Sequence, residues 1–352
     1  MTMNTKKSLL SVALLSALSL TSVSALADSP TGYGRLDITL TNSDHGFTTQ
    51  NRKAGTVLEN NFSRVGVKGS EKINDDYELL YQMEVQVNGA TNEGDDDVFK
   101  SRSTYLGIAS KTMGTVLVGR NDTVMKSSKG NVEAFDLTNA AYNRMIAGQD
   151  RKADGITYYS PTIAGAFTVN GTYLVDDNYE GSDETQYAIS VIAGDKKLKK
   201  QNYYVAGAYN TIGGVDAYRA VGQVKMGDFK VGGLFQNTES QTNAEKEGNS
   251  YFFTVTYDLN GVDLKVEYGR DEAGFGKFIK YNSEVASTAD YNSATDVEVT
   301  SLVFGAEYKL SKSTMLQAHY AMYDGEYQID NSGTVIDLQD DNIATVGVRF
   351  NF

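Results

Sequence analysis

Charged side chains, rather than nucleophiles or metal ligands, are the residues of this sequence that can do chemistry. The 352 residues contain no cysteine, which removes thiol nucleophiles, disulfides and cysteine-based metal sites. The two histidines are His45 and His319, and neither has an evident Ser-His-Asp setting. We therefore expect no catalytic residue, no metal site, no cofactor and no enzymatic activity.

Four acidic residues are concentrated in one long polar stretch, 122–152. A structureless connection of this length is usually functional or disordered. The stretch is the longest connection between the strand-like segments described below, and its acids are either functional groups or ordinary solvated surface charges. These residues are Asp122, Glu133, Asp136 and Asp150.

The whole chain is acidic, with 45 Asp and Glu against 32 Lys and Arg and a net charge of −13. This balance argues against a nucleic-acid partner, which requires a basic surface. Only two prolines accompany 34 glycines and 23 tyrosines. Such a composition favours long strands joined by turns.

The amino terminus has the features of a cleaved signal peptide covering residues 1–27. Lys6 and Lys7 form a basic start, Leu9 to Leu20 form an apolar core, and Ala25-Leu26-Ala27 supplies small residues at the cleavage site. A membrane anchor is the alternative, but the apolar run is shorter than the roughly 18–20 residues of a spanning helix. Residues 28–352 would then form one domain with a net charge of 30 − 45 = −15. An exported chain without cysteine fits a bacterial envelope.

Apolar and polar residues alternate strictly over segments of about ten residues, which is the pattern of strands that span a membrane. In 77–87, for example, Tyr77, Leu79 and Tyr81 share one face, whereas Glu78 and Gln82 lie on the other. The pattern predicts sixteen strands, at 31–42, 60–70, 75–90, 99–110, 113–121, 153–161, 164–176, 183–195, 200–211, 214–226, 228–238, 249–259, 262–271, 297–310, 313–326 and 338–352.

The connections between these strands alternate in length. Those after even-numbered strands are short, such as Asn260-Gly261, whereas 43–59, 122–152 and 272–296 are long. Outer-membrane barrels have short periplasmic turns and long external loops. A soluble sandwich or propeller also alternates, but its strands are shorter. The sequence therefore predicts an all-β fold, a 16-stranded antiparallel transmembrane β-barrel.

Seven sequence segments resemble the general porins of Gram-negative bacteria, in order and over essentially the whole mature chain. They are Gly32–Asp37, Ser63–Glu71, Arg102–Gly107, Gly114–Arg120, Gly155–Pro161, Gly305–Lys312 and Val346–Phe352. The resemblance implies a water-filled barrel in the outer membrane, usually a homotrimer, whose third external loop folds into the lumen and narrows it.

The same resemblance assigns two sets of charged residues to the narrowest point of the pore. Stretch 122–152 would be the constriction loop, with Glu133 and Asp136 near its tip. The opposing wall would carry a basic ladder at the matching positions Arg35, Arg64, Arg102 and Arg120.

Alternation supports an inward direction for Arg35 and Arg64 and is silent for Arg102 and Arg120. The alternative is that some of these arginines pair structurally with wall carboxylates. Arg151 and Lys152 are candidates to extend the ladder.

Two further features lie near the predicted periplasmic side. Terminal Phe352, with Phe350 on the same face, resembles the signal read by the outer-membrane assembly machinery, although packing into an aromatic girdle is the alternative. Lys196, Lys197 and two following lysines lie in a predicted periplasmic turn. They are either solvated or in contact with phosphate or lipid headgroups.

These features predict passive diffusion of small hydrophilic solutes and ions, with a mild cation preference because of the acidic mature chain and its loop acids. The expected partners are two further copies of the chain, outer-membrane lipid and lipopolysaccharide, the assembly machinery and the solutes. The alternatives are an enzyme on a barrel, an adhesin or receptor, and a substrate-specific porin.

Overall fold

The computed structural model describes residues 30–91, 97–175 and 185–352. The predicted signal peptide, 1–27, lies outside the described residues and stays a prediction. No described helix combines the length and the apolar character that a membrane crossing requires.

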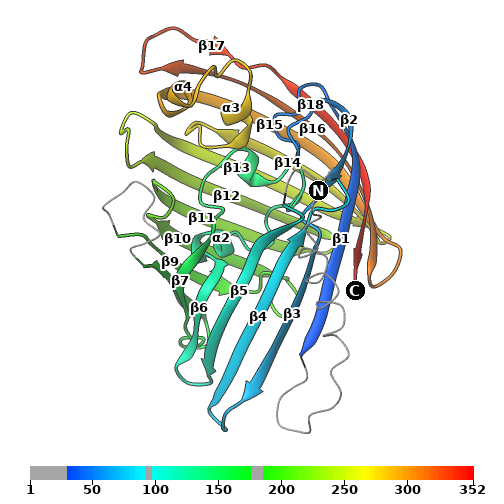
Figure 1. Ribbon diagram of the computed structural model, residues 1–352, viewed down its shortest axis with the longest axis vertical. Helices are drawn as coiled ribbons and strands as arrows, with labels where there is room; N and C mark the ends of the chain where they lie inside the picture. The colour runs from blue at the N-terminus through cyan, green and yellow to red at the C-terminus, as the bar shows by residue number, and fades with distance from the viewer. Residues whose placement is uncertain (1–29, 92–96, 176–184) are drawn as a thin grey trace, which may run out of the picture.

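Antiparallel strands make up most of the described chain (Figure 1). Their bounds are β1 (Thr31–Ser43), β2 (Gly55–Asn60), β3 (Arg64–Lys72), β4 (Tyr77–Val87), β5 (Phe99–Ser110), β6 (Gly114–Asp122), β7 (Arg151–Tyr159), β8 (Phe167–Leu174), β9 (Tyr187–Gly194), β10 (Tyr203–Asn210), β11 (Val215–Met226), β12 (Phe229–Ser240), β13 (Glu247–Leu259), β14 (Val262–Asp271), β15 (Ala294–Lys309), β16 (Thr314–Ile329), β17 (Ile336–Asp337) and β18 (Asp341–Asn351). Short helices lie in the connections: α2 (Val124–Ser128), the 3₁₀ helix η1 (Tyr142–Arg144), α3 (Lys277–Tyr281) and α4 (Thr288–Asn292).

The eighteen strands form a closed wall of sixteen. Strands β2 and β3 both pair with β1 and are one wall strand, interrupted at residues 61–63, where Phe62 has φ 59°. Strand β17 has two residues and pairs only with β16, so the wall has 18 − 2 = 16 strands. The first and last strands, β1 and β18, pair antiparallel and lie side by side in Figure 1. The predicted 16-stranded antiparallel barrel is confirmed.

The wall is apolar outside and polar inside. On β1, Leu36 and Leu40 are 50% and 47% exposed, whereas the residues that follow each of them, Asp37 and Thr41, are fully buried. This inverts the arrangement of a water-soluble domain, in which apolar side chains fill the interior. The outward face therefore suits lipid and the inward face suits water and other polar groups.

Two of the three register shifts in the wall lie beside predicted arginines and disturb the alternation there. Between β4 and β5 the register shifts at Glu84, so that Arg102 and Ser103 both lie buried opposite this carboxylate. Between β6 and β7 a second shift separates Gly119 from Asn121. A bulge adds one residue to a strand and re-aims the side chains around it. This explains why period two could not orient the two arginines of these strands.

The third long connection, 123–150, folds onto the inner wall and carries α2 with it. The hydroxyl of Tyr204 donates to the carbonyl of Ser128 at 2.8 Å, and Arg219 Nη1 donates to the carbonyl of Met125 at 2.8 Å. Both donors project from wall strands opposite β1. We call this connection the inner loop.

Asn139 fixes the far end of the inner loop to the opposite wall. Its Nδ2 donates to Glu59 Oε2 at 2.6 Å and to Thr345 Oγ1 at 2.9 Å. Its Oδ1 lies 2.6 Å from Nε2 of His319. All four side chains are buried. The loop therefore crosses the lumen as a strap held at both ends.

Removal of the Asn139 amide should loosen this strap. In Asn139→Ala, buried groups of Glu59 and His319 lose a partner, at a cost of about 1–3 kcal/mol. We expect a lower Tm and a noisier open-channel current in planar bilayers. Asn143→Ala is the matched control, because its Oδ1 has no hydrogen-bond partner among the described residues. Equal noise and equal Tm in the two variants would contradict this role for Asn139.

Deletion of Phe352 should weaken the seam that closes the barrel. The backbone of Phe352 exchanges two hydrogen bonds with Gly34, at 2.8 and 3.1 Å. We expect a lower yield of heat-modifiable barrel in the outer membrane. Phe352→Ala keeps the backbone bonds and removes the aromatic ring, so it separates seam closure from a side-chain assembly signal. Wild-type yield and assembly kinetics in both variants would show that neither is needed.

Candidate functional site in the lumen

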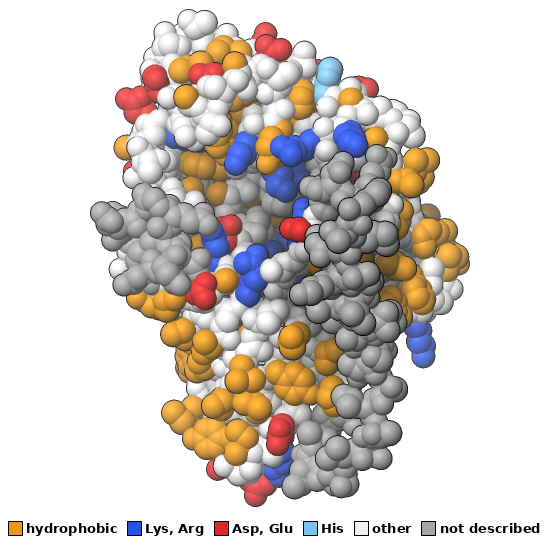
Figure 2. All heavy atoms as spheres, in the orientation of Figure 1, with side chains coloured by type: hydrophobic (Ala, Val, Ile, Leu, Met, Phe, Trp, Pro, Cys, Tyr) orange, Lys and Arg blue, Asp and Glu red, His pale blue; other side chains and the backbone are white. Residues whose placement is uncertain are grey.

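Two adjoining cavities occupy the lumen beside the inner loop. The first has a volume of about 400 Å³ and the second about 370 Å³. Both are lined by Asp136 and Leu137 of the inner loop and by Lys196 of the turn between β9 and β10. Figure 2 shows lysine and arginine side chains gathered around the hollow in this face of the molecule.

The second cavity contains two of the predicted arginines. Arg64 Nε lies 3.4 Å from Glu84 Oε2, and Arg102 Nε donates to the other carboxylate oxygen. The hydroxyl of Tyr33 donates to Glu84 at 2.9 Å. One carboxylate thus holds two guanidinium groups, which leaves one positive charge in excess. Pairing of these arginines with a wall carboxylate, the alternative considered from the sequence, is therefore present, but it does not neutralise both Arg64 and Arg102.

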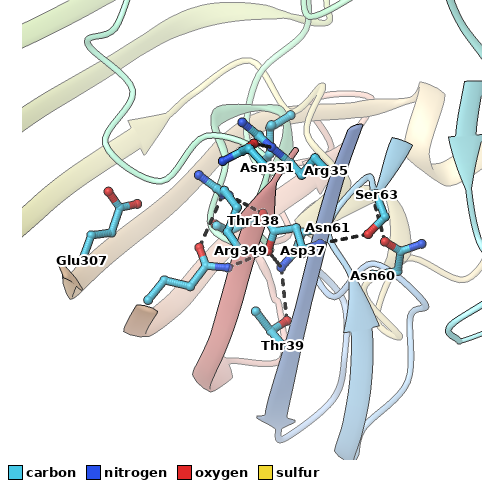
Figure 3. Close-up of polar contacts among 12 residues, drawn as sticks. Arg35, Asp37, Thr39, Asn60, Asn61, Ser63, Thr138, Glu307, Arg349 and Asn351 are labelled. Atoms are coloured by element: carbon cyan, nitrogen blue, oxygen red, sulfur yellow. Dashed lines mark hydrogen bonds and ion pairs between the residues drawn. The ribbon is translucent and has the colours of Figure 1, made fainter. Parts of the chain in front are cut away.

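Arg35 faces the first cavity from β1 (Figure 3). Its Nε donates to Asn351 Oδ1 at 2.8 Å, and no carboxylate of the described chain lies within ion-pair distance of it. Two strand positions away across the seam, Arg349 pairs with Asp37, which also accepts from Gln317 Nε2 at 2.6 Å. Of the two arginines, only Arg35 keeps its charge without a carboxylate partner.

Arg120 is placed differently from the other three predicted arginines. It lies at the second bulge, opposite Thr104, and lines neither cavity. The neighbouring Arg151 lines the second cavity and lies 2.9 Å from Asp122 Oδ1. The structure therefore brings Arg35, Arg64 and Arg102 to the cavities. Arg151, rather than Arg120, is the further arginine that lines the second cavity.

The two predicted acids of the inner loop share one lysine, Lys129. It binds Glu133 and lies 2.9 Å from Asp136 Oδ1. The Glu133 side chain is only 2% exposed and also accepts from the backbone N–H of Tyr142. The Asp136 side chain is 50% exposed. Asp136 is thus the acid presented to solvent, whereas Glu133 chiefly fixes the loop.

The pKa values of Glu133 and Asp136 are shifted in opposite directions. Burial raises the pKa of Glu133 above its usual value, against the opposing effect of Lys129. Partial desolvation inside the lumen would by itself raise the pKa of Asp136, but the charge and hydrogen bond of Lys129 outweigh this effect and lower that pKa to about 2. Asp136 therefore stays ionised at physiological pH.

Several lining bases were missed by the sequence analysis. The inner-loop stretch contains Lys126 and Lys129 as well as its acids, and these two lysines were not among the predicted site residues. Lys265 lies on the polar face of an alternating strand, so the sequence pattern predicts that its side chain points into the lumen. No sequence signal placed Lys196 and Lys197 in the lumen, because turns carry no periodicity.

Positive charge exceeds negative charge on the lining of the two cavities by 11 − 6 = 5, and by four once Asp37, which lies behind the lining and pairs with Arg349, is included. The bases are Arg35, Arg64, Arg102, Lys126, Lys129, Arg151, Lys196, Lys197, Lys230, Lys265 and Arg349, and the acids are Glu84, Asp122, Glu133, Asp136, Asp263 and Glu307. Within the described ranges no three acidic or imidazole groups gather so as to hold a metal ion.

Comparisons with known proteins agree with this architecture. The major outer membrane protein P.IB of Neisseria sicca is 24% identical over 304 residues, which cover 84% of this chain and 78% of that protein. The anion-selective porin from Comamonas acidovorans superposes with a TM-score of 0.64 at 16% identity, over 92% of this chain and 99% of that one. The trimer form of in-vitro folded OmpT of Vibrio cholerae gives a TM-score of 0.63 at 18% identity, with the same coverage. These structural likenesses show the fold.

The family is shown by a direct match to a family model. The model described as Gram-negative porin matches residues 13–328, which is most of the chain. Together with the closed barrel and its charged lumen, this match means that the chain belongs to the Gram-negative porins, which are channels of the outer membrane rather than enzymes.

Proposed function

We propose that this porin conducts small hydrophilic solutes and ions by passive diffusion, with a preference for anions. The observation that carries the proposal is the surplus of positive charge on the cavity lining, which is four even when Asp37 is counted against Arg349. Fixed charges at a constriction act at short range and set the ion preference of a channel. An aqueous lumen is expected for sixteen strands, since about eight would be filled by side chains.

This proposal replaces the cation preference expected from the net charge of the sequence. Charges farther from the pore axis than the Debye length, about 8 Å at physiological salt, are largely screened. Of the 45 Asp and Glu residues in the sequence, six line the two cavities, so the net charge of the chain says little about the charge of the lining. Of the inner-loop acids, Glu133 is buried against Lys129 and Asp136 shares that same lysine.

The other functions considered from the sequence have less support. The anion-selective porin of Comamonas acidovorans indicates that this fold is compatible with anion preference. Six lysines and five arginines line the two cavities, and so many like charges suit attraction of anions in general better than recognition of one substrate. Binding of host ligands by the external loops is compatible with conduction.

A homotrimer is the assembly we infer, by analogy with the trimer form of the Vibrio cholerae protein. Wall segments 31–42, 99–110 and 113–121 would supply the contact, and lipopolysaccharide would surround the outer rim. Sedimentation in mild detergent tests the trimer, which a purely monomeric species would exclude.

Ion preference is tested by reversal potentials across a potassium chloride gradient. We expect anion preference that weakens as salt rises, because screening shortens the range of the lining charges. Arg35→Gln should reduce the preference, since this charge has no carboxylate partner. Asp136→Asn should increase it, and Glu133→Gln should have a smaller effect because its side chain is buried.

Asp228→Asn is the matched control, because Asp228 is an exposed acid in a short turn and lines neither cavity. Its reversal potential should equal that of the wild type. Cation preference in the wild type, or equal shifts for Asp136→Asn and the control, would overturn the proposal.

A further inference from the structure

The turn 195–202 between β9 and β10 enters the lumen from the side of the short turns. Lys196 lines both cavities and Lys197 lines the first. Leu198, which follows these lysines in the turn, is buried. It belongs to the same apolar cluster as Val132 of the inner loop and Tyr204 of the wall. An apolar anchor of this kind holds the turn inward, where an exposed turn would extend into the periplasm. We call 195–202 the lysine turn.

Asp195 shapes the lysine turn through hydrogen bonds to its backbone. Its carboxylate accepts from the backbone N–H groups of Lys197 and Lys199 at 2.9 Å and of Lys200 at 2.8 Å. These backbone hydrogen bonds lower the pKa of Asp195 to about 2. The carboxylate is thus committed to the backbone, and the turn carries four lysines against one acid.

The acids around the first cavity are already matched with lysines. Glu307 lies 2.7 Å from Lys265, and Asp263 lies 3.6 Å from Lys230. Glu133 and Asp136 share Lys129, as described above. Because these two carboxylates share one amine, a single negative charge, on the half-exposed Asp136, is left over against the bases of this cavity.

Three bases of the first cavity consequently lack a carboxylate partner among the described residues. They are Arg35, Lys196 and Lys197, and both lysines are exposed to the cavity rather than packed away. A rigid guanidinium fork and two mobile amines match the several oxygens of one multivalent oxyanion. A monovalent ion such as chloride carries a single negative charge, so the same three bases attract it more weakly.

We propose that the lysine turn forms the periplasmic half of the constriction, and that Lys196, Lys197 and Arg35 make a saturable site for multivalent oxyanions of the phosphate class. The inference rests on the proposed anion conduction and adds a binding step to it. Free phosphate and the phosphates of small esters share this chemistry. A phospholipid headgroup is the other source of phosphate, but these lysines face the lumen.

Titration of inorganic phosphate into chloride solution tests the site. Wild-type channels in bilayers of neutral lipid, at constant ionic strength, should lose chloride conductance saturably as phosphate is added. In Lys196→Gln with Lys197→Gln the half-blocking concentration should rise by at least about tenfold, because two charge-assisted contacts are lost. Arginine at both positions should preserve the block.

The matched control removes two lysines from other short turns, in Lys111→Gln with Lys312→Gln. Both residues are exposed and line neither cavity. This variant should block within about twofold of the wild type. A separate variant, Leu198→Asp, keeps every lysine but removes the apolar anchor, so it should also lose the block if the turn must be held inward.

Phosphate that carries current without saturation, or an equal block in the two double variants, would overturn the site. An unchanged block in Leu198→Asp would overturn the anchored turn. These outcomes differ from a cation-preferring reversal potential, which would overturn the proposed function itself. An anion-preferring channel without phosphate saturation would contradict only the present inference.

Discussion

Backbone hydrogen bonding in lipid is the constraint on which the rest of this structure depends. The hydrocarbon core offers no water to unpaired N–H and C=O groups, so a sheet that spans it must have no open edge. Pairing of β1 with β18 meets this requirement, from Arg35 opposite Asn351 to Ser43 opposite Ile343. Outside the bulges, period two then assigns each wall residue either to lipid or to the lumen.

A closed wall of this size creates a second requirement, since an empty cylinder would be too wide to select among solutes. The inner loop meets it by placing an apolar core inside the lumen. Phe135 packs so closely against β15 that a Cβ on Gly305 would lie 2.5 Å from its ring, and the ring of Tyr142 lies 4.1 Å from that of Phe252. Selectivity then depends on the few charges left unpaired at the surface of this core.

The strand pattern was predictable from sequence, and the charge pattern only partly. The predicted 262–271 matches β14 at both ends, because turn residues bound an uninterrupted alternation there, and the predicted 99–110 matches β5 despite its bulge. Arg102 was not orientable, since a bulge breaks the period at its neighbour. The pairing of Glu133 with Lys129 depends on how the loop folds inward. The sign of the lining charge therefore had to come from the structure.

The lysines of 196–197 illustrate why net charge misleads in a barrel. A single buried residue, Leu198, decides whether this turn is a solvated appendage or part of the lumen wall. Its burial depends on side chains more distant in sequence, such as Val132. Local composition records the charge of the turn and says nothing of its location.

The most direct measurement of the central claim, that unpaired bases rather than net charge govern the lumen, is the location of ions inside it. Crystals of the protein grown in rubidium bromide would be measured at the absorption edge of each ion. The account predicts anomalous bromide peaks in the cavity bounded by Arg35, Lys196 and Lys197, with rubidium confined to the external acidic loops. Rubidium in that cavity, with bromide absent from it, would contradict the account.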